Sequence, residues 1–356
     1  MEPQTLEAQP ASMSSYPKAA IVILNWNGRF FLEKFLPSVY NSTYPNLEFI
    51  VGDNGSTDDS VAFVQDFYPG IRVIRTGNNL GFAGGYNQVL QQVDADYYVL
   101  LNSDVEVTPD WLQPIIALME KDTRIAATQP KVLNYHLRDT FEHAGAAGGY
   151  MDRFGYPFCR GRILNVLEKD EGQYDDACRI FWATGAAMVI RKPCWEQMGG
   201  FDADFFAHME EIDLCWRLQS AGYTIWYCPE AIVYHVGGGT LNKENPYKTY
   251  LNFRNNLFML QKNLPLARAI LIIFIRFWLD LLAVIRFLAE GKSRDAQAVS
   301  KAHVSFFRYF RKTAAKRKQA TSADKIPVAG MYNGSIMWAF FIRGKKYFSD
   351  LQRNRF

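Results

Sequence analysis

The chain has 356 residues, of which 49% are apolar and 15% aromatic, and its formal net charge is +3. This length accommodates one large domain with an appendage or two domains, and the apolar content excludes a chain that is disordered throughout. The small net charge hides a division, because residues 1–265 hold 21 Lys and Arg against 31 Asp and Glu, whereas residues 266–356 hold 18 against 5. An acidic body of charge −10 therefore carries a basic C-terminal region of charge +13.

Residues 1–17 contain two acidic residues, no Lys or Arg and no apolar core, which is typical of a disordered lead and unlike a secretory signal. The five cysteines are odd in number and show no CxxC spacing. We therefore expect neither a disulfide framework nor a structural zinc site, and a reducing compartment fits this pattern.

Four short apolar runs follow, rich in β-branched and aromatic residues: Ala20–Leu24, Leu47–Val51, Ile71–Ile74 and Tyr97–Leu101. Helix-like stretches around 30–40, 59–67 and 84–93 separate them. Continuous apolar strands that alternate with amphipathic helices predict an α/β domain, in which a Rossmann-like, mostly parallel sheet has helices on both faces. In such a domain, ligands bind beyond the carboxyl ends of the strands.

Each of these strands runs into a polar loop, and the loops are Asn25–Asn27, Asp53–Asp58, Thr76–Asn79 and Asn102–Asp104. Together at one sheet edge they would form a polar site for a phosphorylated ligand. An acid such as Asp53 can accept hydrogen bonds from a nucleobase or ribose, and the polar residues from Asn102 to Glu106 can hold a hard divalent cation. Taken alone, each segment is also explained as a turn with a helix cap.

In combination, these segments resemble the family 2 glycosyltransferases with a GT-A fold, specifically the rhamnosyltransferase-like branch that decorates bacterial surface polysaccharides. The resemblance runs from about Ala19 to Leu260. It rests on seven segments in the family's order: Asn25–Asn27, Asp53–Asp58, Asn79–Asn87, Asn102–Asp104, Gly199–Asp202, Glu210–Arg217 and His235.

The resemblance implies a nucleoside diphosphate sugar donor, a dTDP- or UDP-sugar, with its base bound by Asp53. It also implies that Asp104 ligates Mg²⁺ or Mn²⁺ and that His235 completes the metal shell. The family's metal triplet often reads Asp-x-Asp, but Asn102 stands first here; because an amide is a poorer ligand, we assign Asn102 to a ribose or water contact. Further donor contacts are expected at Asn25, Asn27, Asn79, Gly81, Asn87 and Arg254, the last as a clamp on the diphosphate.

Glu210–Asp213 matches the family's Glu-Asp-x-Asp segment, whose second acid is the catalytic base. Glu211 occupies that position, where the family more often has Asp, and either acid can accept a proton from an acceptor hydroxyl. On a helix, Glu210 and Asp213 would share a face with Glu211 about 100° away, so these two are the fallback bases. An acidic turn that only caps the helix is the alternative.

Two further segments resemble the family's acceptor-side and donor-sugar segments. We expect sugar or acceptor contacts from Trp182, Thr184, Gly185, Phe201 and Asp202. Packing of Trp182 beneath a loop is an equally good explanation of that residue.

These assignments divide the chain into a lead at 1–17, a GT-A domain at 18–262 and an amphipathic, basic, helical, membrane-associating region at 263–356. Across Ile270–Leu288, apolar residues favour insertion by about 4–8 kcal/mol, and Arg276 and Asp280 oppose it by about 2.5–3.5 kcal/mol each. We therefore expect a helix that lies in the membrane interface. The basic residues that follow would contact anionic lipid: Arg308, Arg311, Lys312, Lys316, Arg317 and Lys318.

The combined expectation is an inverting, metal-dependent glycosyltransferase that acts on a lipid-linked or growing glycan. It would be a peripheral or interfacially anchored protein at the cytoplasmic face of the inner membrane, and nucleic acid is not an expected partner. A catalytically weak, nucleotide-sugar-binding scaffold remains the alternative, because Asn102 and Glu211 replace commoner acids. Nucleotidyl transfer is disfavoured, since no Gly-rich basic loop follows the first strand.

Overall fold

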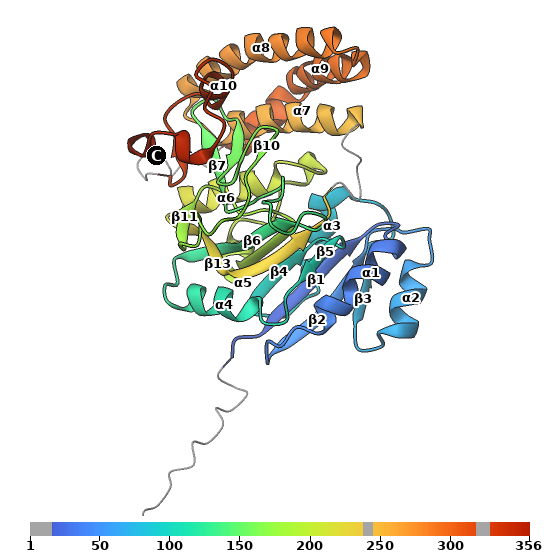
Figure 1. Cartoon of the computed structure of the whole chain (residues 1–356). Helices are drawn as coiled ribbons and strands as arrows, with labels where there is room; N and C mark the ends of the chain where they lie inside the picture. The colour runs from blue at the N-terminus through green and yellow to red at the C-terminus, as the bar shows by residue number, and fades with distance from the viewer. Residues whose placement is uncertain (1–15, 238–244, 318–327) are drawn as a thin grey trace, which may run out of the picture.

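The computed structural model describes residues 16–237, 245–317 and 328–356 (Figure 1). The predicted lead therefore lies outside the described residues, apart from Tyr16 and Pro17, and so does Lys318. The four strands predicted from apolar runs are present as β1 (Ala19–Asn25), β2 (Leu47–Asp53), β3 (Arg72–Arg75) and β4 (Tyr97–Leu101). The helices between them are also present, as α1 (Arg29–Tyr40), α2 (Ser60–Phe67) and α3 (Gly81–Leu90).

The main sheet has the order β11-β13-β6-β12-β4-β1-β2-β3, with β5 added beside β13. The pairs among β4, β1, β2 and β3 are parallel, as expected for strands linked through helices. The other half is mixed, because β12 is antiparallel to both β4 and β6. This half consists of β5 (Val105–Val107), β6 (Ile125–Asn134), β11 (Cys178–Ile180), β12 (Ala187–Arg191) and β13 (Thr224–His235).

Both faces of this sheet are covered, which confirms the layered α/β arrangement. Ala20 and Val22 of β1 belong to one buried cluster, while the alternating Ile21 and Ile23 belong to another on the opposite face. The first cluster includes residues of α3 and α6 (Glu210–Ser220), and the second includes residues of α1, α2 and α4 (Leu112–Glu120). A short helix, α5 (Lys192–Gln197), follows β12.

A second, smaller sheet joins the middle of the chain to its C-terminal end. Its order is β10-β9-β8-β7-β14, and β14 pairs in parallel with β7. The ring of Phe356 packs against Tyr150 and Phe158, with centroids 5.3 and 6.5 Å apart. The strands are β7 (Gly149–Asp152), β8 (Pro157–Cys159), β9 (Arg162–Ile163), β10 (Val166–Leu167) and β14 (Met331–Tyr332).

The predicted C-terminal helical region is present and forms a layer at one end of the molecule, above the main sheet in Figure 1. Its helices are α7 (Pro246–Asn263), α8 (Leu266–Ala289), α9 (Ser293–Lys316) and α10 (Ile336–Phe341). Short 3₁₀ turns, η2 (Ala203–Phe205), η4 (Phe348–Asp350) and η5 (Arg353–Arg355), complete the elements. Among the helices described, none has both the length and the apolar content needed to cross a bilayer.

Three of the basic residues expected to contact lipid form hydrogen bonds or ion pairs within the protein. Lys312 lies 2.7 Å from a carboxylate oxygen of Asp204, and Lys316 bonds to both Asp202 and Asp204. Arg317 donates to the backbone carbonyls of Gln261 and Leu264 at the end of α7. The acidic body attracts these side chains, so part of the charge division is neutralised within the fold.

Candidate functional site

The carboxyl ends of β1 and β2 meet in register, so that Asn25 lies beside Asp53 at the edge of the sheet. Nδ2 of Asn25 donates to Oγ of Ser60 at 2.9 Å, and Oδ1 of Asn27 accepts from the backbone N–H of Thr57 at 2.7 Å. One carboxylate oxygen of Asp53 accepts from the backbone N–H of Ser56 at 3.1 Å. The two predicted loops are therefore one hydrogen-bonded unit, in which Asn25 and Asn27 hold the loop that carries Asp53.

Asn54 is a site residue that the sequence analysis did not single out. Its Oδ1 accepts from the backbone N–H of Leu80 at 3.1 Å, and its Nδ2 donates to the carbonyl of Gly81 at 3.1 Å. Asn79 supports the same turn, because its Oδ1 accepts from the backbone N–H of Gly81 at 2.9 Å. In the sequence, only the position of Asn54 next to Asp53 could have indicated that Asn54 belongs to the site.

The start of α3 is packed tightly against the segment that precedes α6. Gly81 has φ +72°, and a Cβ at this position would lie 2.5 Å from the carbonyl oxygen of Phe206. Asn87 forms two hydrogen bonds with the backbone of Phe201, one as donor at 2.8 Å and one as acceptor at 2.9 Å. In this structure Gly81 and Asn87, both predicted donor contacts, join α3 to residues 201–206.

The segment before α6 has an unusual backbone. Phe206, His208 and Met209 all have positive φ, at 64°, 70° and 73°. Asn255 of α7 donates to the carbonyls of Phe205, Ala207 and His208 at 2.8–2.9 Å. Non-glycine residues in this conformation persist only where surrounding contacts hold them, and they concentrate at functional sites.

Arg254 also holds the segment before α6 in place. Its guanidinium donates to the carbonyls of Asp204 and Phe205 at 3.0 Å and to Oδ1 of Asn255. A clamp on a diphosphate, as the resemblance implies, would require the side chain to exchange some of these bonds.

Glu210 and Glu211 begin α6 directly after this segment. Each has a buried carboxylate oxygen, Oε2, without a hydrogen-bond partner. Burial raises the pKa of Glu211 to about 7, and burial together with the neighbouring Glu211 charge raises the pKa of Glu210 well above its ordinary value. A Cβ placed on Gly185 would lie 3.9 Å from Cβ of Glu211, so these two predicted residues border the same space.

Asp213, the other fallback base, is fully buried and fully engaged. Its carboxylate lies 2.9 Å from Nζ of Lys262 and 2.9 Å from Nε of Arg217, and it accepts from Asn263 at 2.8 Å. Burial would raise the pKa of Asp213, but Lys262 and Arg217 hold it below its ordinary value. These contacts favour a structural role for Asp213 and leave Glu210 and Glu211 as the acids suited to proton transfer.

The two predicted metal ligands lie together. Asp104 directly precedes β5, and antiparallel pairing of β5 with β13 places His235 opposite Val105. As a result, Nε2 of His235 lies 3.2 Å from Oδ1 of Asp104, and Nδ1 lies 3.1 Å from Oε2 of Glu142. Burial would lower the pKa of His235, but these two carboxylates raise it to about 10.

This pair fits a divalent cation. Neighbouring ligands of an octahedral ion bound at about 2.1 Å are themselves about 3 Å apart, close to the 3.2 Å separation of His235 and Asp104. Glu142, which the sequence analysis missed, lies where a carboxylate orients a metal-binding imidazole through its other nitrogen. Within the described residues, no set of three or more His, Cys, Asp or Glu side chains is arranged to hold a metal.

Most of the residues predicted to contact the sugar or the acceptor are buried or bonded to other parts of the protein. Nε1 of Trp182 donates to the carbonyl of Tyr150 at 3.0 Å, and Oγ1 of Thr184 accepts from the backbone N–H of Ala186 at 3.2 Å. Phe201 is buried, and Asp202 lies 2.7 Å from Nζ of Lys262. Asn102 is half-buried next to this region, with its backbone N–H bonded to the carbonyl of Ala186.

Buried polar atoms that lack a partner are concentrated around the site. Such atoms are rare in folded proteins, and each one marks a place where a ligand or water is expected. Those in or next to the predicted motifs are Oδ1 of Asn25, Nε2 of His208, Oε2 of Glu210 and Oε2 of Glu211.

Residues 20–187 match the sequence profile described as glycosyl transferase family 2. The chain carries a family 2 glycosyltransferase domain. The prediction from the seven motifs is thereby confirmed.

Two bacterial rhamnosyltransferases are similar to this glycosyltransferase. N-acetylglucosaminyl-diphospho-decaprenol L-rhamnosyltransferase of Mycobacterium tuberculosis is 27% identical over 218 residues, which cover 57% of this chain and 71% of that protein. Rhamnosyltransferase WbbL of Escherichia coli is 27% identical over 218 residues, covering 59% of this chain and 80% of that protein. The glycosyltransferase is thus rhamnosyltransferase-like.

Two solved structures share the fold. Mannosyltransferase PcManGT from Pyrobaculum calidifontis, in complex with GDP-Man and Mn²⁺, has a TM-score of 0.51 and 14% identity and covers 87% of each chain. GalNAc-T7 with UDP, GalNAc and Mn²⁺ has a TM-score of 0.55 and 17% identity, covering 70% of this chain and 48% of that one. At this level of identity the similarity establishes a GT-A-like fold.

Proposed function

We propose that this glycosyltransferase transfers a sugar, L-rhamnose by preference, from a nucleoside diphosphate donor to a hydroxyl of a lipid-linked glycan, with inversion at the anomeric carbon. The observation that carries the proposal is the position of Glu211, whose buried Oε2 lacks a partner. Glu211 borders Gly185, and the next residue, Ala186, accepts a hydrogen bond from Asn102, two positions before Asp104. The similarity to an enzyme named for a diphospho-decaprenol acceptor supports the acceptor class.

The donor half of the reaction is assigned to the polar sheet edge. Asp53 would contact the nucleoside of a dTDP- or UDP-sugar, and the loop that carries it is already ordered by Asn25, Asn27 and Asn54. Asp104 and His235 would hold Mg²⁺ or Mn²⁺, since Mn²⁺ accompanies GDP-Man in one structural relative and UDP with GalNAc in the other. A bound divalent cation neutralises the charge that develops on the leaving diphosphate.

The acceptor half is assigned to Glu211. Its raised pKa of about 7 suits a general base, which takes the proton of the acceptor hydroxyl as that oxygen attacks the anomeric carbon. Attack from the face opposite the diphosphate inverts the anomeric configuration and needs no covalent enzyme intermediate. Burial and the neighbouring Glu211 charge raise the pKa of Glu210 well above its ordinary value, which favours its protonated form and limits charge repulsion with ionised Glu211.

A thermal-shift screen of dTDP-, UDP- and GDP-sugars with and without Mn²⁺ tests the donor assignment, because a ligand that binds the folded state raises the melting temperature. We expect a shift that requires both the cognate nucleotide sugar and the metal. The cognate pair is then incubated with a polyprenyl-diphosphate-linked sugar, and the product is analysed for its linkage. The absence of any nucleotide-dependent shift would contradict the donor assignment.

A nucleotide-sugar-binding scaffold is the second candidate, favoured by Asn102 and Glu211 in place of the family's commoner acids. The two functions differ in one measurement. A scaffold would show the metal-dependent thermal shift but neither donor hydrolysis nor sugar transfer. An enzyme would show the thermal shift and also turn over the donor.

A further inference from the structure

Helix α8 presents an apolar surface to its surroundings. Ten of its large apolar side chains are between 42% and 62% exposed, whereas helices on soluble proteins normally bury this type of residue. At 100° per residue, these ten lie within an arc of about 160°. They are Leu266, Ile270, Leu271, Phe274, Phe277, Trp278, Leu281, Leu282, Ile285 and Leu288.

The opposite side of α8 buries its charges. Arg276 is 2% exposed and Asp280 is 1% exposed. The guanidinium of Arg276 lies 3.2 Å from Oδ1 of Asp280 and donates to Asn256 of α7, and it stacks 3.9 Å above the ring of Tyr156. The second oxygen of Asp280 lies 3.0 Å from Nε2 of His303 on α9.

These buried contacts fix the rotation of α8. Rotating the helix to bury its apolar side would break the Arg276–Asp280 pair and its bonds to neighbouring elements, and unpaired buried charges are costly. The apolar side therefore faces outward because the fold holds it there.

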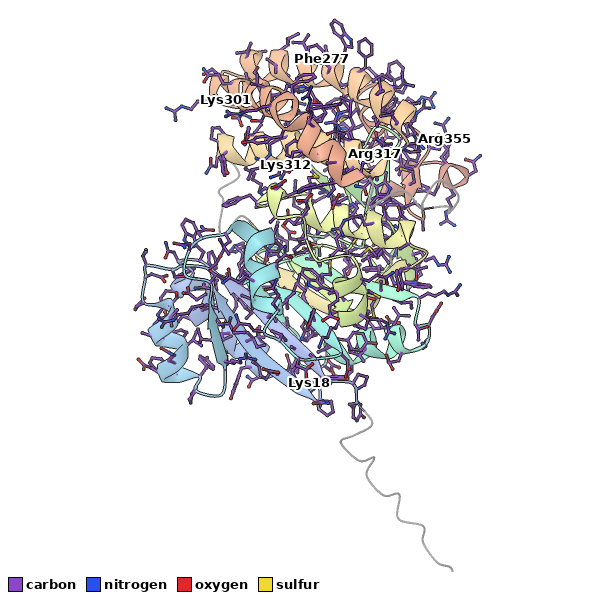
Figure 2. The ribbon with its side chains drawn as sticks, turned by 180° about the vertical axis from the view of Figure 1, so that it is seen from behind. Lys18, Phe277, Lys301, Lys312, Arg317 and Arg355 are labelled. Atoms are coloured by element: carbon purple, nitrogen blue, oxygen red, sulfur yellow. The ribbon has the colours of Figure 1, made fainter. Side chains whose placement is uncertain are left out.

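Helix α10 extends the same surface. The guanidinium of Arg286, near the end of α8, lies 5.5 Å from the ring centroid of Phe341. Trp338, Phe341 and Ile342 are 56%, 50% and 62% exposed. Figure 1 shows α8 and α10 at the end of the molecule remote from the main sheet, and Phe277 lies at its outer edge in Figure 2. We call these ten side chains of α8, together with Trp338 and Phe341 of α10 and the following Ile342, the docking face.

The exposed charges around the docking face are mostly basic, and the exposed acid Glu290, directly after α8, pairs with Arg286 at 2.7 Å. Residues 266–289 contain a single acid, the buried Asp280, and residues 336–346 contain none. The exposed basic residues in these two segments are Arg268, Arg286, Arg343, Lys345 and Lys346. An apolar face bordered by basic residues matches the acyl boundary and headgroups of an anionic bilayer.

We propose that the docking face binds the surface of an anionic lipid bilayer, with α8 lying in the interface and Arg343, Lys345 and Lys346 contacting headgroups. The enzyme would thereby be held where a lipid-linked acceptor resides. Since α8 does not meet the requirements of a spanning helix, its binding is peripheral. The proposal does not depend on the donor or on the identity of the base.

Flotation of the full chain with phosphatidylcholine vesicles, with and without phosphatidylglycerol, tests the proposal. We expect binding that is strongest with phosphatidylglycerol. The double variant Phe274→Glu/Leu282→Glu should weaken binding by about tenfold or more, because two large apolar side chains no longer enter the lipid. Lys345→Gln/Lys346→Gln should weaken binding to phosphatidylglycerol vesicles by about tenfold and reduce its salt dependence.

Phe67→Glu is the matched control, since Phe67 is 69% exposed on α2, far from the docking face. It should bind vesicles as the unaltered protein does. Circular dichroism melting and the nucleotide-sugar thermal shift establish that each variant is folded and retains its donor site, so failure here is distinct from failure of the proposed function.

Equal vesicle binding by Phe274→Glu/Leu282→Glu would overturn the proposal. So would a light-scattering result in which the unaltered protein is a dimer that binds no vesicles and this variant is a monomer.

Discussion

His235 and Asp104 are 131 positions apart in the sequence, yet Nε2 of the imidazole lies 3.2 Å from Oδ1 of the carboxylate. The pairing of β5 with the last residues of β13 brings them together, since it aligns His235 with Val105, the residue after Asp104. Both side chains are buried and Glu142 lies on the far side of the ring. A divalent cation would therefore meet two ligands that the fold has already oriented.

Replacing Asp104 by Asn should reduce Mn²⁺ affinity by more than about tenfold, because an amide is a weaker ligand than a carboxylate. Isothermal titration with Mn²⁺ in the presence of the nucleotide sugar measures this directly. Glu106→Gln is the control, since Glu106 is two residues away but pairs with Arg138 at 2.8 Å. Unchanged Mn²⁺ affinity in Asp104→Asn would remove this residue from the metal site.

Glu211→Gln should lower turnover by about 10²- to 10⁴-fold while donor affinity stays nearly constant, since the amide cannot accept the acceptor's proton. Glu210→Gln is the matched variant on the same helix. Burial and the neighbouring Glu211 charge raise the pKa of Glu210 well above its ordinary value, which favours the neutral carboxyl. We therefore expect only a small change in turnover when an amide replaces it. Comparable loss in both variants, or loss in Glu210→Gln alone, would make Glu210 the base.

The pH dependence of turnover tests the same assignment independently. A base works only when ionised, and burial raises the pKa of Glu211 to about 7. The rate should therefore rise with pH through about 7 and fall tenfold per pH unit well below it. A rate that is constant from pH 5.5 to pH 8 would show that no group with this pKa limits the reaction.

Gly81→Ala should destabilise the protein and reduce turnover, because a Cβ there would meet the ring and the carbonyl of Phe206 at 2.4 and 2.5 Å. Gly77→Ala is a matched control: Gly77 also has positive φ, at 85°, but a Cβ there would contact nothing within 4 Å. Each variant bears the cost of a left-handed alanine, about 1–2 kcal/mol. Urea unfolding should show a larger loss for Gly81→Ala, and equal losses would contradict the close packing.

The parallel half of the sheet and its polar edge were predictable, because each strand is a continuous apolar run that ends in a recognisable loop. The antiparallel strands β12 and β5 were not, since pairing direction depends on long-range topology and the stretch from 125 to 245 has no simple period. Asp104 and His235 could be assigned only by resemblance. Glu142 and Asn54 escaped notice because a single polar residue acquires meaning only from its neighbours in space.

Sequence reasoning was weakest where buried polar contacts decide the role of a residue. Arg276 and Asp280 are four positions apart, a spacing that allows them to pair on a helix, but their burial against α7 and α9 could not be read from that spacing. Lys312 and Lys316 looked like lipid ligands because the acids that bind them lie more than 100 positions earlier. The net charge of a segment can be counted from the sequence, but the partners of each charged side chain depend on the fold.

Asn255→Ala should slow turnover and destabilise the protein by about 1–3 kcal/mol, because the carbonyls of Phe205, Ala207 and His208 would lose their donor. The strained segment that positions Glu210 and Glu211 would then relax. Asn252→Ala is the control on the same helix, since its Nδ2 donates only to the carbonyl of Lys248, one turn away. If thermal stability falls but turnover of the folded fraction does not, Asn255 supports the fold without positioning the acids.

Lys262→Met should be among the most destabilising single changes, because Nζ lies 2.7 Å from Asp202 and 2.9 Å from the fully buried Asp213. Removing one partner of a buried ion pair costs about 3–5 kcal/mol, and methionine keeps the volume. Lys301→Met, at an exposed position on α9, is the control.

The pH dependence of stability identifies the cause of that loss. Burial would raise the pKa of Asp202, but Lys262 and Lys316 hold it at about 2, below the value of about 3.9 for an unfolded chain. Asp202 therefore contributes stability above pH 4 that is lost as the pH falls toward 2. In Lys262→Met this contribution should shrink, so the urea midpoint should fall less between pH 5 and pH 3 than in the unaltered protein. An equally steep fall in both proteins would show that Lys262 does not set the ionisation of Asp202.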